Sequence, residues 1–296
     1  MDPTHIAELL QPFLPQANDQ RLTANDGLYQ NISTYIDILL RWNARVNLTA
    51  IRDPDEIVTR HFGESLFTAR HLFPTRPGVG TAAQACPERS RRGCPAERSF
   101  VPPLHSAASG EASPAPSVRS RAEELAKEKE APAPGSAAND QRPLQPCDER
   151  GEGSNDRPRL ADVGSGAGFP GIPIKLWNPK ICLTLIEANH KKATFLREAA
   201  RALTLTDIDI YNGRAENLAA VQPGFEVVTL RAVERFEDAL RVSAALLIPG
   251  GRLALLAGSS QQDDAARLLP FFTWSAPLLI PMSRSRMLLL GNSPGL

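Results

Sequence analysis

The apolar positions near the start of the chain recur at helical spacing. Five of them fall on one face of a helix: Ile32, Tyr35, Ile36, Leu39 and Leu40. This helix is predicted to end within the segment from Trp42 to Thr49. A second helix is predicted after Asp53-Pro54 and runs to Leu72, because aspartate favours the N-cap and proline the first turn.

From Leu160 onward, short apolar runs alternate with helical periodicity. The predicted strands are 160–163, 181–186, 208–211, 227–230 and 252–256, and the predicted helices are about 191–203 and 236–247. Such alternation is typical of a mostly parallel sheet with helices on both faces. Two segments of the tail, 274–277 and 287–290, are suited to closing the sheet as an antiparallel hairpin. The sequence therefore predicts a Rossmann-like α/β fold.

The segment between Arg76 and Arg159 breaks both patterns. It holds 12 of the 26 prolines and three of the four cysteines, yet it has no isoleucine and a single aromatic residue, Phe100. Too little apolar surface is present to offset the entropy of ordering the backbone. We therefore predict three regions: an N-terminal helical segment (1–75) that packs on the core, a disordered low-complexity insertion (76–159), and a catalytic core (160–296).

Charge and composition exclude several classes of protein. The chain has 33 basic and 33 acidic residues, so a nonspecific nucleic-acid binder is disfavoured and any contact with nucleic acid needs a local basic patch. The candidates for such a patch are Arg41, Arg45, Lys191, Lys192, Arg197 and Arg201. No run of about eighteen apolar residues occurs, and the cysteines show no zinc spacing. These features favour a cytoplasmic, monomeric protein without a membrane span or a metal site.

A glycine-rich loop is predicted where the first strand ends. The sequence from Asp162 to Gly171 reads Asp-Val-Gly-Ser-Gly-Ala-Gly-Phe-Pro-Gly, with glycines spaced G-x-G-x-G. Such a loop lets backbone N–H groups approach a ligand, although a plain strand-to-helix turn would use similar residues. Counted from Gly164, the third glycine comes one residue earlier than in the dinucleotide spacing G-x-G-x-x-G, and the lysine of a phosphate-binding P-loop is absent from this loop.

An acidic residue supports the cofactor interpretation of this loop. Glu187 ends the second predicted strand, where a carboxylate can accept both hydroxyls of a ribose. A nucleoside cofactor held without a phosphate-binding lysine is indicated, and S-adenosylmethionine fits that description. NAD remains an alternative at this point.

The same motifs resemble the RsmG (GidB) family of bacterial 16S rRNA methyltransferases. The likeness lies in the stretch from Asp162 to Pro173 and in four other segments: 42–52, 191–197, 214–216 and 231–233. It implies transfer of a methyl group from S-adenosyl-L-methionine to N7 of guanine 527 in the rRNA of the small ribosomal subunit.

The resemblance also implies roles for single residues. Gly164 and Phe169 would line the methionine and ribose side of the cofactor, and Glu187 would hold the ribose. Ala215 and Glu216 would contact the adenine, and Arg231 would lie near the cofactor carboxylate and the target base. One departure concerns the fifth strand, after which the family usually has Lys-Gly and this chain has Ala257-Gly258.

No acid–base residue is predicted, because guanine N7 carries a lone pair and no proton. Catalysis then depends on holding N7 in line with the methyl group. Two other hypotheses share the cofactor residues: a methyltransferase with a small-molecule or protein acceptor, and an inactive module that binds the cofactor or RNA.

The composition of the insertion generates the first testable prediction. Deleting residues 80–156 is expected to preserve cooperative unfolding and cofactor affinity, because no core contacts are expected from this segment. Denaturant unfolding and cofactor titration of the deleted and full-length chains measure this. A deleted chain that fails to fold would contradict the assignment.

Overall fold

The computed structural model describes residues 1–14, 26–74, 157–221 and 224–295. Most of the predicted insertion (76–159) lies outside the described residues, so the three-region division stays a prediction. One boundary residue is corrected: Arg159, assigned to the insertion, is the first residue of a strand, because its backbone N–H and guanidinium both bond the Glu226 carboxylate.

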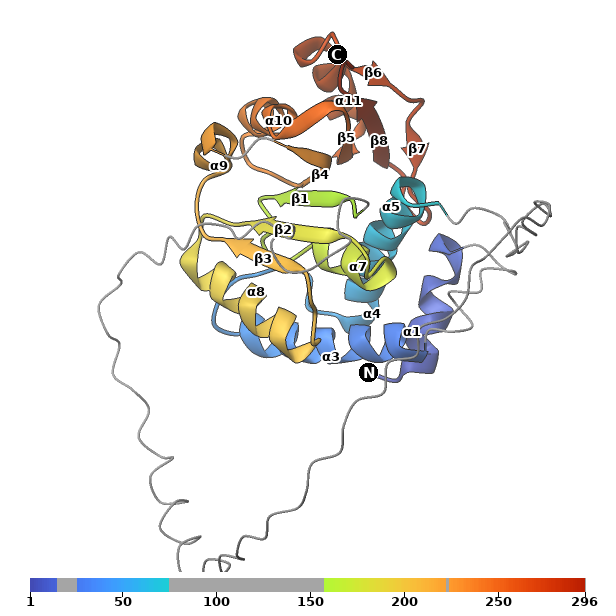
Figure 1. Ribbon diagram of the computed structural model, residues 1–296. Coiled ribbons are helices and arrows are strands. Elements are labelled where there is room, and N and C mark those ends of the chain that lie inside the picture. Colours follow the sequence, from blue (N-terminus) through green and yellow to red (C-terminus); the bar gives the residue numbers. More distant parts are fainter. Residues whose placement is uncertain (15–25, 75–156, 222–223, 296) are drawn as a thin grey trace, which may run out of the picture. The chain divides into compact units, whose positions relative to one another are not determined.

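The C-terminal part forms one mixed sheet (Figure 1). Its strands are β1 (Arg159–Val163), β2 (Cys182–Ile186), β3 (Ile208–Tyr211), β4 (Phe225–Arg231), β5 (Leu247–Gly258), β6 (Thr273–Trp274), β7 (Leu278–Leu279) and β8 (Arg286–Asn292). Their order is β3-β2-β1-β4-β5-β8-β6, with β7 also paired to β8. The strands β1 to β5 are parallel, and β8 is antiparallel to both β5 and β6. The Rossmann-like sheet and its antiparallel closure are confirmed.

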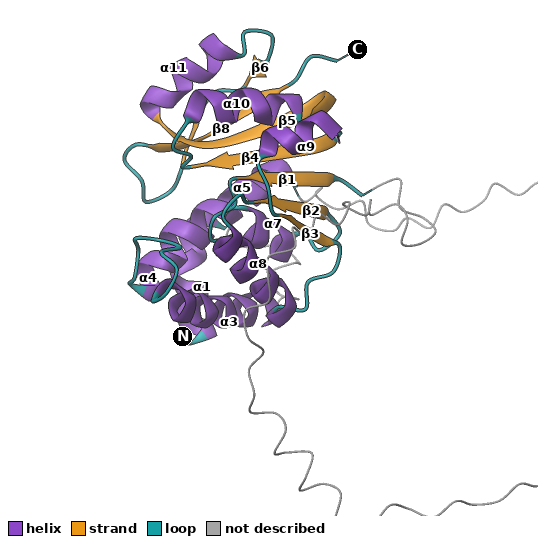
Figure 2. Ribbon diagram, turned by 90° about the vertical axis from the view of Figure 1, so that its left-hand side faces the viewer, coloured by secondary structure: helices purple, strands orange, loops and turns teal. Residues whose placement is uncertain are grey.

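The helices cover both faces of this sheet (Figure 2). One layer consists of α9 (Ala215–Val221), α10 (Phe236–Ala245) and α11 (Ser259–Leu268). The other face carries α7 (Gly171–Trp177) and α8 (His190–Ala202) together with the N-terminal helices. The N-terminal helices are α1 (Pro3–Leu10), the 3₁₀ turn Gln11–Phe13, α3 (Asp26–Asn43), α4 (Pro54–Ile57), the π-helical turn Val58–Gly63 and α5 (Glu64–Leu72).

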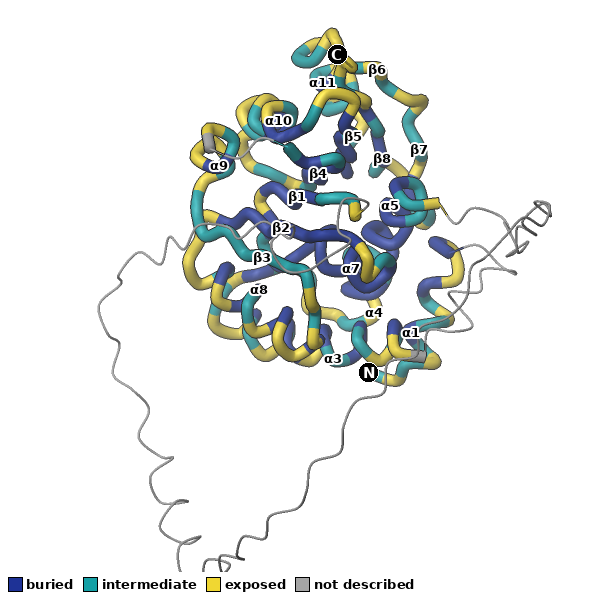
Figure 3. Tube along the Cα trace, in the orientation of Figure 1, coloured by how far each residue is buried: buried dark blue, intermediate teal, exposed yellow. Residues whose placement is uncertain are grey.

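Side-chain alternation along the strands divides the core into two layers. Leu160, Val227 and Leu288 pack in the cluster that includes α1 to α5, whereas their neighbours Ala161 and Val228 pack in the cluster under α10 and α11. The strands in the middle of the sheet are accordingly buried (Figure 3). Both faces of the parallel sheet are thus covered, which such sheets require.

The helix predictions are confirmed, with shifted ends. Asp53 caps α4 by accepting the Glu56 backbone N–H at 2.8 Å, as its sequence position indicates. The predicted helix 236–247 ends two residues earlier, because Leu247 already pairs with Phe225 as part of β5. Among the described residues, no helix combines the length and apolar character needed to cross a membrane.

The polar side chains of the Trp42–Thr49 segment have structural partners. Asn43 is buried; its Oδ1 accepts the backbone N–H groups of Leu48 and Thr49, and its Nδ2 donates to the Thr49 carbonyl. Trp42 packs edge-on against Phe195 of α8, with ring centroids 5.9 Å apart. This turn carries the chain from α3 toward the π-helical segment.

Gly168, where the glycine loop packs against the N-terminal helix α3, is the basis of the second prediction. Gly168 has φ +78°, and a Cβ there would lie 2.7 Å from Ile172 Cδ1 and 2.8 Å from Tyr35 Oη. Gly168→Ala is expected to lower the free energy of unfolding by about 2 to 4 kcal/mol through backbone strain and overpacking. Denaturant unfolding measures it. Gly27→Ala is the control, since a Cβ at that position would have no atom within 4 Å, and an equal loss in both variants would contradict the argument.

Candidate functional site

The glycine loop turns sharply at the carboxyl end of β1. Gly164, Gly166 and Gly168 all have positive φ values, between +55° and +78°. The Ser165 N–H donates to the Ile186 carbonyl at 3.0 Å, and the Gly166 N–H donates to the Glu187 carboxylate at 2.8 Å. The loop is therefore fastened to the end of β2.

The buried carboxylate of Asp162 stabilises the glycine loop through hydrogen bonds. Asp162 accepts the Thr229 hydroxyl at 2.7 Å and the Gly171 N–H at 3.3 Å, so it ties β1 to β4 and to the start of α7. Burial raises the pKa of Asp162 to about 6, against the opposing effect of these hydrogen bonds. Asp162 begins the glycine motif but is not among the predicted site residues. It acts as a support for the loop.

Two adjoining cavities lie beside the loop. The larger has a volume of about 560 Å³ and the smaller about 440 Å³, which is the usual range for small-molecule sites. Both are lined by Gly164, Glu187, Lys192 and Ala232. The structure brings all six predicted cofactor residues to these cavities: Phe169 and Arg231 line the larger one, and Ala215 and Glu216 line the smaller one.

The residues at the boundary between the cavities fit a nucleoside with a ribose. The Glu187 carboxylate accepts the N–H groups of Gly166 and Asn189, at 2.8 and 2.7 Å. A carboxylate has about four acceptor positions, so two remain for hydroxyl donors. Gly164 has φ +68°, and a Cβ there would approach Val233 Cγ1 to 3.2 Å, so this position favours glycine. S-adenosylmethionine fits such a donor and acceptor set.

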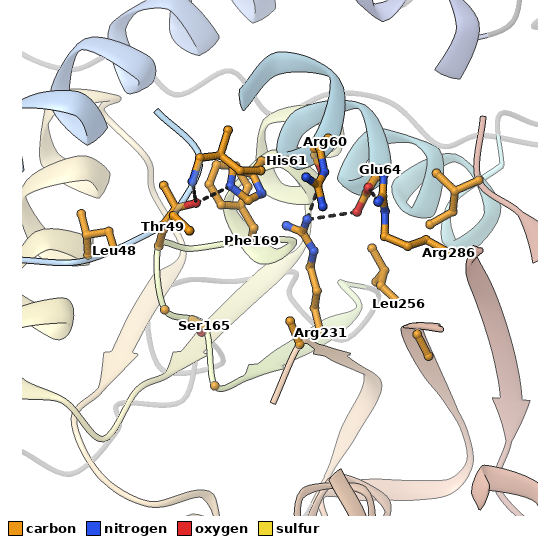
Figure 4. Close-up of a pocket in the computed structure, with 18 of the residues that line it drawn as sticks. Leu48, Thr49, Arg60, His61, Glu64, Ser165, Phe169, Arg231, Leu256 and Arg286 are labelled. Carbon is orange, nitrogen blue, oxygen red and sulfur yellow. Dashed lines mark hydrogen bonds and ion pairs between the residues drawn. The ribbon is translucent and has the colours of Figure 1, made fainter. Parts of the chain in front are cut away.

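The wall opposite the loop comes from the N-terminal helices (Figure 4). Arg60 and His61 lie in the π-helical turn, Glu64 begins α5, and all three line the larger cavity. The His61 ring stacks on Phe169 with centroids 4.7 Å apart, and its Nε2 lies 2.8 Å from the Thr49 hydroxyl. These polar residues were not predicted to belong to the site.

Ion pairs join this wall to the sheet. The Glu64 carboxylate is buried and accepts Arg231 Nη2 at 3.0 Å and Arg286 Nε at 2.5 Å. Arg231 Nη2 also donates to the Arg60 carbonyl at 2.9 Å. Glu64 is separated from Arg231 by 167 positions and from Arg286 by 222, so no local sequence pattern could indicate these pairs.

The predicted basic residues divide between two places. Arg41 and Arg45 line a separate cavity with Trp42 and Glu198, whereas Lys192 lines both cavities beside the loop. The other three, Lys191, Arg197 and Arg201, lie on α8. Ala257 lies at the end of β5 and lines the larger cavity without bringing a charge.

Comparison with known proteins now identifies the relationship. The profile of the family described as rRNA small subunit methyltransferase G (GidB) matches residues 28–81 and 151–273. The chain belongs to this family. The chain is accordingly a methyltransferase that uses S-adenosylmethionine.

Individual relatives agree with the family assignment. The ribosomal RNA small subunit methyltransferase G of Xylella fastidiosa (strain 9a5c) is 28% identical over 249 residues, covering 83% of this chain and 78% of the relative. The ribosomal RNA small subunit methyltransferase G of Mycoplasma capricolum is 43% identical over 106 residues, covering 36% of this chain and 46% of the relative. Among solved structures, the Methanococcus jannaschii fibrillarin pre-rRNA processing protein matches at 14% identity and TM-score 0.41, covering 47% of this chain and 68% of that one.

The charges in the cavity wall generate the third prediction. Burial and the guanidinium groups of Arg231, Arg60 and Arg286 lower the pKa of His61 from 6.5 to about 3. Between these values the unfolded chain binds a proton that the folded chain does not, so the stability that neutral His61 contributes is lost as the pH falls below about 6.5. Asp162 acts in the opposite direction, since its raised pKa contributes stability that is lost as the pH rises toward 6.

His61→Gln removes one of these two effects. The difference in unfolding free energy between the native chain and this variant is expected to shrink by about 3 kcal/mol from pH 6.5 to pH 4. Denaturant unfolding at several pH values measures it, and the comparison at pH 7.5 gives the packing cost of the substitution. A difference independent of pH would show that His61 titrates alike in both states.

Proposed function

We propose that this chain methylates N7 of guanine 527 in the 16S rRNA of the small ribosomal subunit. The observation that carries the proposal is the junction of the two cavities at Gly164 and Glu187, within a member of the small-subunit methyltransferase G family. When bound, S-adenosylmethionine supplies a methyl group on a positively charged sulfur. The residues of the chain then have to hold the cofactor and the guanine in line.

We assign the residue roles that the family resemblance implies, and the positions of these residues beside the two cavities support them. Glu187 accepts the ribose hydroxyls, and Ala215 and Glu216 contact the adenine in the smaller cavity. Gly164 and Phe169 lie on the methionine side, and Arg231, at the end of β4, lies near the cofactor carboxylate and the target base. No proton is removed from N7, so none of these side chains has to act as a base.

The partners and cellular setting belong to the same proposal. A neutral chain gains little from nonspecific attraction to phosphates, so binding depends on a local basic surface. Arg41, Arg45 and the basic residues of α8 are the candidates for that surface. We propose that the enzyme acts as a cytoplasmic monomer and prefers an assembled small subunit over free 16S rRNA.

The fourth prediction tests this function. The chain is incubated with labelled S-adenosylmethionine and small subunits that lack the modification, and 7-methylguanine is mapped by strand cleavage. Label is expected at guanine 527, with much less on free 16S rRNA. Label in protein or small molecules would support the alternative acceptor, and cofactor binding without transfer would support the inactive module.

As part of the same test of function, a variant of Glu187 tests the assigned cofactor role by measuring binding. Glu187→Gln keeps the shape of the side chain and removes the charge, so cofactor affinity is expected to fall by about 10-fold or more. Isothermal titration measures the affinity, and Glu198→Gln, on the exposed face of α8, is the matched control. Equal affinities in the two variants would contradict the role of Glu187.

A further inference from the structure

The lining of the larger cavity carries more positive than negative charge among the described residues. Among the described residues that line the larger cavity, the basic ones are Arg60, Lys192, Arg231 and Arg286, and the acidic ones are Glu64 and Glu187. Glu64 alone serves two guanidinium groups, those of Arg231 and Arg286. Excess charge removed from water is costly unless an opposite charge compensates for it.

The neighbouring side chains do not supply that compensation. Within the described part of the chain, the ion-pair partner of Arg60 is Glu56, which is half-exposed and does not line the cavity. Glu187 lies on the opposite side, where its oxygens accept backbone N–H groups of the loop. The described lining of the larger cavity therefore presents a net positive charge to an anionic ligand that enters it.

Two buried polar side-chain atoms on the wall opposite the loop lack hydrogen-bond partners in the described part of the chain. Arg60 Nε and His61 Nδ1 are buried, and neither has a hydrogen-bond partner among the described residues. The bonds of Arg286 and Arg231 use only the Nε of the first and one Nη of the second. Each guanidinium has five N–H donors in a fixed fork, which matches the oxygens of a carboxylate or a phosphate.

The position of Arg286 suits a ligand that enters from the cavity mouth. Its side chain is 35% exposed, whereas Glu64 beneath it is 2% exposed. The register of β5 and β8 places Arg286 opposite Gly258. Arg286 thus brings positive charge to the end of β5, where Ala257 brings none.

We propose that Arg286, together with Arg231 and Arg60, forms a binding site for a ligand oxyanion, with Glu64 holding the guanidinium groups in place. The proposal rests on the proposed function, because the oxyanion then has two sources: the carboxylate of the cofactor or a phosphate of the RNA. Arg286 is the residue that this inference adds to the site.

The fifth prediction concerns Arg286→Ala, with Arg284→Ala as the control. Arg284 is exposed, lies two residues earlier and does not line the cavity. Titration calorimetry measures binding of S-adenosylhomocysteine, which has the carboxylate, and of 5′-methylthioadenosine, which lacks it. Binding of under-methylated small subunits is measured at several salt concentrations. Arg286→Ala is expected to weaken binding of S-adenosylhomocysteine or of the small subunits by about 10-fold or more relative to the control.

The pattern of losses identifies the source of the oxyanion. A loss for S-adenosylhomocysteine but not for 5′-methylthioadenosine assigns the site to the cofactor carboxylate. Unchanged binding of both, with weaker subunit binding and a salt slope reduced by about one, assigns it to an RNA phosphate. If Arg286→Ala equals Arg284→Ala in all three measurements, the proposal is wrong.

A second variant covers the case in which Arg286→Ala fails to fold. Arg286→Lys keeps a positive charge beside Glu64, but an ammonium group lacks the fork that reaches two acceptors at once. The affinity for the ligand that Arg286→Ala affects is expected to fall by about 3-fold or more. Binding equal to that of the native chain would overturn the proposal. Because these titrations need no turnover, absence of methylation by the native chain rejects the proposed function and leaves this site to be judged by binding alone.

Discussion

A parallel sheet has to be covered by apolar side chains on both faces. Which helices cover each face decides which residues line the larger cavity of this protein. One face is covered by α9 to α11, which arise between and after the strands. The other face is covered by α7, α8 and helices from residues 3–72, far earlier in the chain. The N-terminal helices are thereby part of the core, and the larger cavity has their residues as its second wall.

The ion pairs of Glu64 make this arrangement specific at the site. Apolar packing is not directional, so it holds α5 against the sheet but does not decide which polar side chains contact one another. The bonds from Arg231 and Arg286 bring α5, β4 and β8 together at one carboxylate. A buried ion pair gains little net stability over a well-packed apolar contact, whereas removing one partner alone costs about 3 to 5 kcal/mol. Polar groups in this place are therefore better explained by ligand binding than by stability.

The charge distribution reconciles a neutral chain with a nucleic-acid substrate. The net charge of the whole sequence is zero, but the described lining of the larger cavity has more basic than acidic residues. In a partly buried site each charge is screened less than at the surface, so a small local excess has a large effect on an anionic ligand. His61 is neutral because burial lowers its pKa and the three nearby guanidinium groups lower it further.

Features that depend on local order along the chain were predictable from the sequence. Alternating strands and helices, the Asp53 cap and the glycine loop all have signals that lie within a few residues, and Glu187 was indicated by its place at the end of the second strand. Helices α1, α9 and α11 were missed; α1 and α9 have only eight and seven residues, too few for a strong periodic signal. The groups that face the loop could be known only from the folded chain. Arg60, Glu64 and Arg286 meet Arg231 across long sequence separations, and such contacts arise from the packing of distant segments rather than from any local pattern.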